Sequence, residues 1–342
     1  MQYRTLGRSG AAVSSLALGT MTFGTETDEA GSFEQLDTFL EAGGTLVDSA
    51  DVYSGTESES IIGRWLARRA DARSRIMLAT KGRFAVGSGP NDLGLSRRHL
   101  ADGLDGSLRR LGTDTIDLYQ VHAFDAHTPL AETLRFLDDA VRAGKIHYVG
   151  LSNFTGWQLQ KAVDVADHGH LSVPVTLQPQ YSLLAREIEW EIVPACLDNG
   201  LGLLPWSPLG GGWLTGKYRR DQRPTGATRL GDNPERGMEA YDRRSSERTW
   251  AVIDAVQTIA EQRDVSMAQV ALAWLAGRPG VSSVILGART TEQLLDNLGA
   301  AELRLTESET AQLDEVSSPH VADYPYGEMG VEQRERKIEG GR

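Results

Sequence analysis

The sequence contains very little of what marks extracellular and membrane proteins. Only one of its 342 residues, Cys196, is a cysteine, so no internal disulfide can form and a cysteine-based metal site is implausible. No apolar run approaches the roughly 18 residues of a membrane span, and the N-terminus lacks the basic-then-apolar layout of a signal peptide. A cytoplasmic protein with no membrane partner is therefore the default prediction.

Positive charge is also scarce. Lysine and arginine number 35 against 47 acidic residues, and the resulting net charge of −12 disfavours nucleic acid or an anionic membrane as the main partner. Hydrophobic residues make up 40% and charged residues 24%, a composition typical of soluble globular proteins. The chain is long enough to bury a sizeable core.

Short apolar stretches recur along the chain and alternate with helical patterns. Two N-terminal segments, Tyr3–Leu6 and Ala12–Val13, flank a glycine-containing turn and predict a β-hairpin. Eight further apolar stretches follow, the number that a closed βα barrel needs: residues 16–20, 45–50, 76–81, 115–122, 145–152, 173–180, 201–206 and 282–288.

Amphipathic patterns between these stretches predict helices. Leucines from Leu100 to Leu111 form one apolar stripe, with Ser96 as its N-cap, and a second stripe runs from Leu130 to Val141. Segments 246–263 and 266–277 predict two more helices before the last strand. Strands that alternate with such helices predict parallel βα units, so we expect a single (β/α)8 barrel over residues 1–326, followed by a charged tail, 327–342.

Two connecting segments are longer than usual. Residues 82–95 follow the third barrel strand, and residues 210–245 follow the seventh. Because they follow strands, both are expected on the C-terminal face of the barrel, where active sites occur. A disordered decoration without function is the alternative for 210–245.

Polar side chains stand at or near the ends of three consecutive predicted strands. The second strand ends near Asp48, the third at Lys81 and the fourth at His122, and Tyr53 lies just beyond Asp48. Neighbouring strand ends lie about 5 Å apart, so these side chains can converge on one rim. Each residue alone has an ordinary structural explanation, but their order on adjacent strands favours a catalytic site.

The chemistry that such a cluster supports is proton transfer by a phenol. The pKa of a free tyrosine lies near 10, and we expect the Lys81 ammonium to lower the pKa of Tyr53. Asp48 could keep Lys81 charged and oriented, and His122 could position a substrate oxygen. A barrel hydrolase or isomerase would need a metal or paired carboxylates, and the sequence indicates neither. No metal site is predicted.

Eight ordered stretches resemble the aldo-keto reductases over nearly the whole chain. They include "LGTMTFG" (18–24), "DSADVYSGTESESIIG" (48–63), "GKIHYVGLSNF" (144–154), "WSPLGGGWLTGKY" (206–218) and "VILGARTTEQLLDNLGA" (284–300). The resemblance implies a (β/α)8 barrel that moves hydride between NADPH and a small-molecule carbonyl or alcohol. It also implies a catalytic tetrad of Asp48, Tyr53, Lys81 and His122, in which Tyr53 is the general acid.

The resemblance further implies a set of NADPH contacts. Trp206 corresponds to the aromatic residue that stacks on the nicotinamide, and Arg289 to the position that contacts the 2′-phosphate, a role that suits arginine. The whole implied set is Gly19, Thr20, Met21, Asp48, Ser152, Asn153, Gln178, Trp206, Ser207, Leu209, Gly211, Lys217, Gly287, Arg289, Gln293, Asp296 and Asn297. No GxGxxG motif follows a strand, so a Rossmann mode of cofactor binding is not supported.

Several of these positions have plainer alternatives. Ser152 or Asn153 could cap the following helix, Trp206 could belong to the core, and Lys217 could be a solvated loop residue. The function has an alternative as well, because the potassium-channel β-subunits share part of this pattern and act as regulatory NADP(H)-binding modules. According to the resemblance, those subunits have asparagine where this chain has His122, so the complete tetrad favours an enzyme. Substrate and oligomeric state stay open.

Overall fold

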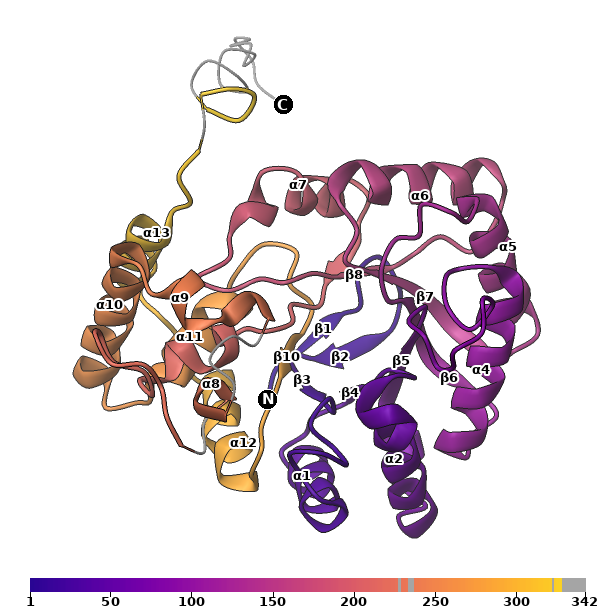
Figure 1. The fold of residues 1–342 in the computed structure, drawn as a ribbon, viewed down its shortest axis with the longest axis horizontal. Coiled ribbons are helices and arrows are strands. Elements are labelled where there is room, and N and C mark those ends of the chain that lie inside the picture. The colour runs from indigo at the N-terminus through magenta and orange to yellow at the C-terminus, as the bar shows by residue number, and fades with distance from the viewer. Residues whose placement is uncertain (227–228, 233–236, 322, 328–342) are drawn as a thin grey trace.

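The computed structural model describes residues 1–226, 229–232, 237–321 and 323–327. At its centre lies a sheet of eight parallel strands in the order β10-β3-β4-β5-β6-β7-β8-β9, surrounded by the long helices (Figure 1). The strands are β3 (Leu16–Gly19), β4 (Leu46–Asp48), β5 (Met77–Gly82), β6 (Ile116–Val121), β7 (Ile146–Ser152), β8 (Thr176–Gln178), β9 (Gly202–Leu203) and β10 (Val284–Leu286). The predicted (β/α)8 barrel is confirmed, and each of the eight apolar stretches overlaps one of its strands.

The two edges of the sheet meet through backbone hydrogen bonds. The amide of Leu203 in β9 donates to the carbonyl of Gly280 at 2.8 Å, and the amide of Ser282 donates to the carbonyl of Leu203 at 2.9 Å. Closer to the C-terminal face, the amide of Ile285 in β10 donates to the carbonyl of Pro205 at 3.0 Å. These bonds close the barrel between β9 and β10, the two edge strands of the sheet.

The predicted N-terminal hairpin is also confirmed. Strands β1 (Tyr3–Thr5) and β2 (Ala12–Ser14) pair antiparallel. The turn between them lies against the beginnings of β8 and β9, because a Cβ atom on Gly7 would come within 2.0 Å of the Val175 carbonyl oxygen. Gly7 also has φ +56°, so glycine is required here for both space and backbone conformation. The hairpin therefore covers the N-terminal end of the barrel.

The helices begin where the sequence provides caps. Ser96 caps α4, Ser246 caps α10 and Ser266 caps α11, each by accepting a bond from a backbone amide three residues later. The longer helices are α1 (Glu29–Glu41), α2 (Glu57–Arg68), α4 (Arg97–Leu111), α5 (Leu130–Arg142), α6 (Gly156–His168), α7 (Ile192–Asp198), α10 (Glu247–Arg263), α11 (Met267–Ala276), α12 (Thr291–Leu298) and α13 (Glu307–Ser317). The short ones are α3 (Ala72–Arg75), α8 (Arg229–Asp232) and α9 (Tyr241–Arg244), with 3-10 turns at η1 (Tyr53–Thr56), η2 (Glu187–Glu189), η3 (Gly210–Thr215), η4 (Gly237–Glu239) and η5 (Gly299–Ala301).

The hydrophobic core has two parts. The larger part fills the layer between strands and helices. The smaller part lies inside the barrel, where strand residues such as Ala17, Leu46 and Leu118 pack with Leu6 and Val13 of the hairpin region. Since these apolar residues fill the hairpin end, polar side chains inside the barrel gather towards its C-terminal end.

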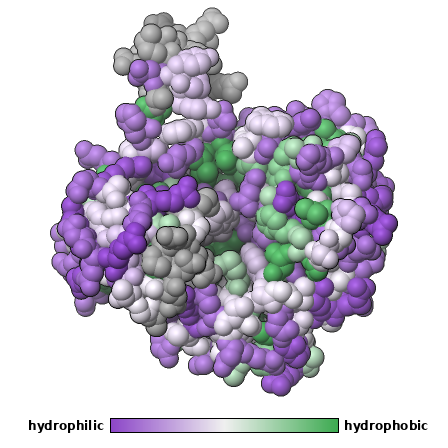
Figure 2. Space-filling model, in the orientation of Figure 1, coloured by the Kyte–Doolittle hydropathy of each residue, from purple (hydrophilic) through white to green (hydrophobic). Residues whose placement is uncertain are grey.

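Both long segments leave strands at the C-terminal face, as predicted. Segment 82–95 contains no helix, whereas the described residues of 210–245 form η3, α8, η4 and α9. Those short elements were not predicted, and residues 227–228 and 233–236 of this segment, like 328–342 of the tail, lie outside the described residues. Figure 2 shows a hollow near the centre of this view, with hydrophobic residues gathered beside it. None of the helices in the described part is both long and apolar enough to span a membrane.

Candidate active site

The ends of β4 and β5 hold a buried ion pair inside the barrel. The ammonium of Lys81 lies 2.7 Å from Oδ2 of Asp48, and the two side chains are 0% and 2% exposed. The same ammonium donates to the Ser49 carbonyl at 2.7 Å. Burial alone would lower the pKa of Lys81, but Asp48 and Tyr53 outweigh it and the pKa is raised. Lys81 therefore stays charged at neutral pH.

Tyr53 follows β4 and reaches back to this ion pair. Its hydroxyl lies 3.2 Å from the Lys81 ammonium, which also lies 4.8 Å from the centre of the phenol ring. The turn that carries it is strained, because Ser54 adopts a positive φ of 52° and is followed by Gly55 at 63°. This turn brings the phenol over the ends of β4 and β5.

The expected direction of the Tyr53 pKa shift was wrong. Burial raises the pKa of the phenol, and Lys81 lowers it by less, so the net direction is upward from 10.0. Desolvation prevails because Asp48 and Asp51 add negative charge near the phenol and offset part of the ammonium's effect. Tyr53 is consequently a protonated phenol at neutral pH, the form that can donate a proton.

His122 stands just beyond the end of β6 and faces Tyr53. The two ring centres are 5.9 Å apart in an edge-on arrangement, and Phe84 packs on the imidazole with its ring centre 4.6 Å away. Burial, followed by the positive charges of Lys81 and Arg83, lowers the pKa of His122 to about 2. The imidazole is neutral, and its Nδ1 atom has no hydrogen-bond partner among the described residues.

Two glutamines hold the other oxygen of Asp48. Gln120 and Gln178 donate to Oδ1 at 3.0 and 2.9 Å. Gln178 was predicted from the resemblance, but Gln120 was missed. The signal was present, because Gln120 lies two residues before His122 in an apolar strand and so points into the barrel with it.

Asp51 is a second missed residue, just behind the catalytic cluster. It is fully buried, and neither carboxylate oxygen has a hydrogen-bond partner among the described residues. Burial, together with the nearby Glu59, raises the pKa of Asp51 to about 7. Its position three residues after Asp48 in a polar turn gave no signal that separated it from a solvated aspartate.

A cavity of about 680 Å³ opens from this cluster. Tyr53 and His122 line it, and Lys81 lies behind them with no exposed surface. The cavity is also lined by every residue of the implied cofactor set: Gly19, Thr20, Met21, Asp48, Ser152, Asn153, Gln178, Trp206, Ser207, Leu209, Gly211, Lys217, Gly287, Arg289, Gln293, Asp296 and Asn297. The structure thus brings the predicted residues together, while their roles stay predictions. Among the described residues, no group of three His, Cys, Asp or Glu side chains could hold a metal ion.

Asn153 and Trp206 connect strand ends on one side of the cavity. The indole of Trp206 donates to Oδ1 of Asn153 at 3.1 Å, and Nδ2 of Asn153 donates to the His122 carbonyl at 2.9 Å. The alternative in which Ser152 or Asn153 caps α6 is wrong, since Thr155 is the N-cap and forms a capping box with Gln158.

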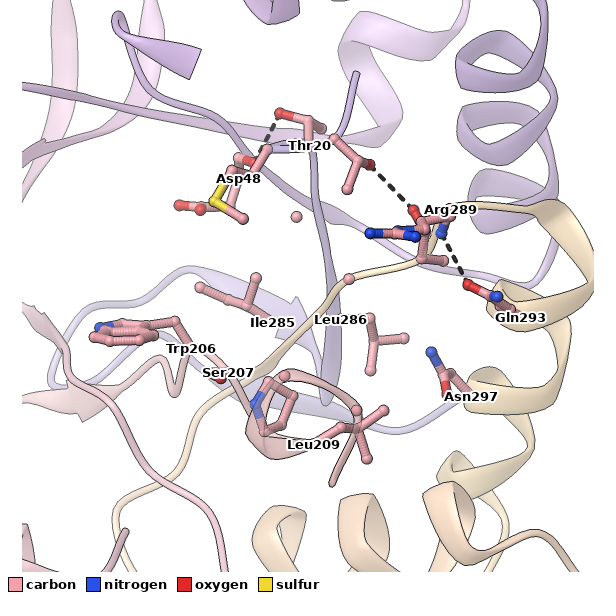
Figure 3. Close-up of a pocket in the computed structure, with 18 of the residues that line it drawn as sticks. Thr20, Asp48, Trp206, Ser207, Leu209, Ile285, Leu286, Arg289, Gln293 and Asn297 are labelled. Carbon is pink, nitrogen blue, oxygen red and sulfur yellow. Dashed lines mark hydrogen bonds between the residues drawn. The ribbon is translucent and has the colours of Figure 1, made fainter. Parts of the chain in front are cut away.

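The far end of the cavity has a different character. Figure 3 shows Trp206 on one side and Gln293 and Asn297, from α12, on the other. Between β10 and α12, the Arg289 guanidinium pairs with Glu26 at 2.5 Å, and the Arg289 amide donates to Oε1 of Gln293 at 3.0 Å. Glu26 also lines the cavity and was missed, because it lies in a polar turn before α1.

A second cation joins Arg289 at this end. The pKa of Lys217 is lowered, first by partial burial and then by the charge of Arg289. Lys217 lines the same cavity but is exposed, so the alternative of a solvated loop lysine is compatible with the structure. The far end therefore offers two positive charges, accompanied by Glu26.

Several known proteins resemble this chain over most of its length. The model of the aldo/keto reductase family matches residues 15–318. An uncharacterised oxidoreductase of Bacillus subtilis is 39% identical over 324 residues, which cover 92% of this chain and 96% of that protein. A probable voltage-gated potassium channel subunit β of rice, Oryza sativa, is 38% identical, over 89% of this chain and 92% of its own. The versiconal hemiacetal acetate reductase of Aspergillus parasiticus is 34% identical, over 93% and 98%.

Proposed function

Because the chain belongs to the aldo/keto reductase family, we propose that it is an NADP(H)-dependent oxidoreductase that reduces aldehydes or ketones to alcohols and runs in reverse on alcohols. One observation carries the proposal. The Tyr53 hydroxyl lies 3.2 Å from the buried ammonium of Lys81 and lines the cavity together with His122. A protonated phenol, a fixed positive charge and a neutral imidazole at one point suit the protonation of an oxygen that gains negative charge.

The cavity fits a nicotinamide dinucleotide phosphate. Its volume of about 680 Å³ lies within the range of small-molecule and cofactor sites. Trp206 offers a flat apolar face near the catalytic end, and Ser152, Asn153 and Gln178 offer amide and hydroxyl groups for a carboxamide. At the far end, Arg289 and Lys217 would hold phosphate charge, with Gln293, Asp296 and Asn297 around the adenosine. The bound cofactor would supply the hydride.

The protein's own residues would manage the proton and the orientation of the substrate. Neutral His122 can donate one hydrogen bond to a carbonyl oxygen, which would hold that oxygen near Tyr53. Tyr53 would then donate its proton to this oxygen as negative charge develops there. Lys81, held by Asp48, would stabilise the phenolate that remains. A proton from solvent would restore Tyr53 after the alcohol leaves.

The second candidate function is a regulatory NADP(H)-binding module with little turnover. The observation that favours it is the 38% identity to a probable potassium channel subunit β. The complete catalytic cluster favours the enzyme, because His122, which could orient a carbonyl oxygen, stands at the position where the resemblance implies asparagine in such a module. Tight NADPH binding with no turnover on any carbonyl would support the module instead.

The decisive experiment follows NADPH oxidation with a panel of aromatic and aliphatic aldehydes and ketones. Tyr53→Phe keeps the ring and removes the proton, so we expect kcat to fall about a thousandfold, within the usual range for general acid catalysis. NADPH affinity, measured by protein fluorescence, should change little. Tyr324→Phe, at a tyrosine that is 69% exposed, is the control and should keep full activity. Equal turnover by Tyr53→Phe and the unmodified protein would refute the catalytic role.

A further inference from the structure

A second cavity lies at the opposite end of the barrel from the catalytic cluster. Its volume is about 270 Å³, and its lining includes Arg4, Arg278 and Arg304 together with Gln2, Ser15 and Thr310. It touches Leu16 at the start of β3, whereas Gly19 at the end of β3 lines the catalytic cavity. The two cavities are thus separated by the length of one short strand, roughly 10 Å.

Three different elements bring the arginines to this cavity. Arg4 belongs to β1, Arg278 follows the C-terminus of α11, and Arg304 follows η5. Arg4 and Arg304 are close enough that the charge of Arg304, after the larger effect of burial, lowers the pKa of Arg4. In a chain with a net charge of −12, a cluster of three arginines around one cavity needs a physical explanation.

Among the residues that the structure describes, acidic side chains neutralise only one of the three arginines. Arg278 pairs with Asp314 at 2.8 Å. Neither Arg4 nor Arg304 has a carboxylate within 4.0 Å among the described residues. The C-terminus of α11 faces Arg4, whose Nη1 donates to the Ala276 carbonyl at 2.6 Å, but a helix end offsets only about half a charge. The cavity therefore keeps a net positive charge of between about one and two units.

Each guanidinium also keeps most of its donors available. Arg4, Arg278 and Arg304 all make their hydrogen bonds through Nη1. A guanidinium has five N–H donors, so three remain on each, at Nε and Nη2, without a hydrogen-bond acceptor among the described residues. The Nε atom of Arg278 is buried without a hydrogen-bond acceptor among the described residues. A buried donor of this kind destabilises the fold unless something accepts its hydrogen bond.

We propose that this cavity is a binding site for a small oxyanion of the phosphate type. Arginine forks match the paired oxygens of such an anion, and a doubly charged anion balances the excess charge of Arg4 and Arg304. A volume of about 270 Å³ admits the anion with part of its water shell, since one water molecule needs only roughly 15 Å³. The site is separate from the proposed cofactor cavity and does not rest on the proposed function.

The experiment compares inorganic phosphate with sodium chloride at equal ionic strength. An anion that binds the folded protein stabilises it by RT ln(1 + [L]/Kd), so the dependence of the unfolding midpoint on phosphate concentration gives an apparent Kd. Isothermal titration calorimetry of the full chain gives the same constant directly. We expect a saturable calorimetric isotherm and a logarithmic rise of the unfolding midpoint with phosphate, neither of which chloride reproduces.

Variants locate the effect. Arg304→Gln removes an exposed charge at the rim, and we expect it to weaken phosphate at least fivefold. Arg4→Gln should weaken it similarly; because Arg4 also binds the end of α11, only the phosphate-dependent part of its unfolding midpoint is compared. Arg98→Gln, at an exposed arginine of α4, is the matched control and should leave the Kd unchanged.

The catalytic cavity holds its own cations, so Arg289→Gln is measured in parallel. If phosphate binds at the arginine cavity, Arg289→Gln keeps the apparent Kd within twofold. Loss of the phosphate effect in Arg289→Gln, with full retention in Arg304→Gln and Arg4→Gln, would overturn the proposal. An equal rise of the midpoint in all variants, without a saturable calorimetric isotherm, would mean an adventitious ion only, and would overturn the proposal as well.

Discussion

The two ends of the catalytic cavity are built in different ways. At the catalytic end, Lys81 and Asp48 come from neighbouring strands and are 0% and 2% exposed. At the far end, Arg289 and Glu26 come from the connections after β10 and β3, and their side chains are 26% and 22% exposed. Both ends are ion pairs, but one is fixed in the barrel interior and the other lies at a partly open rim.

This difference separates chemistry from affinity. A buried pair loses much of its solvation and needs hydrogen bonds on every side, as Ser49, Gln120 and Gln178 provide here, so its geometry is fixed before any ligand arrives. A partly exposed pair is weaker and can exchange one partner for another, such as a phosphate. Substitutions at the two ends should accordingly differ in kind, with stability and turnover affected at one and cofactor affinity at the other.

The largest expected effect is that of Lys81→Met. Removing the ammonium leaves Asp48 buried without its counter-charge, and breaking such a pair typically costs about 3–5 kcal/mol. We expect urea unfolding to show a loss of that size, with turnover abolished. The control is Lys145→Met, which breaks the exposed pair with Asp105, 44% and 45% exposed, and should cost no more than about 1 kcal/mol. Similar losses of unfolding free energy in Lys81→Met and Lys145→Met would show that burial does not determine how much an ion pair stabilises this protein.

A somewhat smaller effect is expected behind the catalytic end, at Asp51. Its pKa is raised from 3.8 to about 7 in the folded state, so folding favours the protonated carboxyl. That contribution is fully present below pH 4 and is lost as the pH rises towards 7. Between pH 5 and pH 8 the loss corresponds to about 2–3 kcal/mol, since one pKa unit equals 1.36 kcal/mol.

Asp51→Asn should remove this pH dependence. The free energy of unfolding, measured in urea at pH 5 and pH 8, should fall less with rising pH in the variant than in the unmodified protein. Asp105→Asn, at an exposed position, should behave like the unmodified protein. An unchanged pH dependence in Asp51→Asn would mean that the carboxyl is ionised in the folded protein at pH 5.

The catalytic end of the cavity was also easier to predict from the sequence than the far end. Strand ends lie at fixed spacings on a barrel rim, so Asp48, Lys81 and His122 on consecutive strands could be placed together from their positions in the sequence. The eight strands and the main helices were equally predictable, because the spacing of apolar residues and N-caps such as Ser96 are local features of the sequence.

Residues that depend on the paths of loops were not predictable from local signals. Glu26 meets Arg289 only because the turn before α1 folds against the connection after β10, where Thr27 donates to the Arg289 carbonyl at 3.1 Å. The Tyr53 pKa illustrates a second limit, since its direction depends on a balance between burial and Lys81 that residue types alone cannot give. Positions at the far end came from the family resemblance instead.

The smallest of these effects is expected at the far end of the cavity, for Arg289→Ala. If Arg289 reads the 2′-phosphate, its removal should weaken NADPH by about 1–3 kcal/mol, the usual value of a hydrogen bond to a charged group, and NADH much less. Titration of protein fluorescence with each cofactor measures this, with Arg98→Gln as the control for lost positive charge. The free energy of unfolding should change by under about 1 kcal/mol, because the pair with Glu26 is partly exposed. Equal losses of affinity for NADPH and NADH would show that Arg289 contacts a part that both cofactors share. A large fall in the free energy of unfolding would show that the Arg289–Glu26 pair stabilises the fold as the buried Lys81–Asp48 pair does.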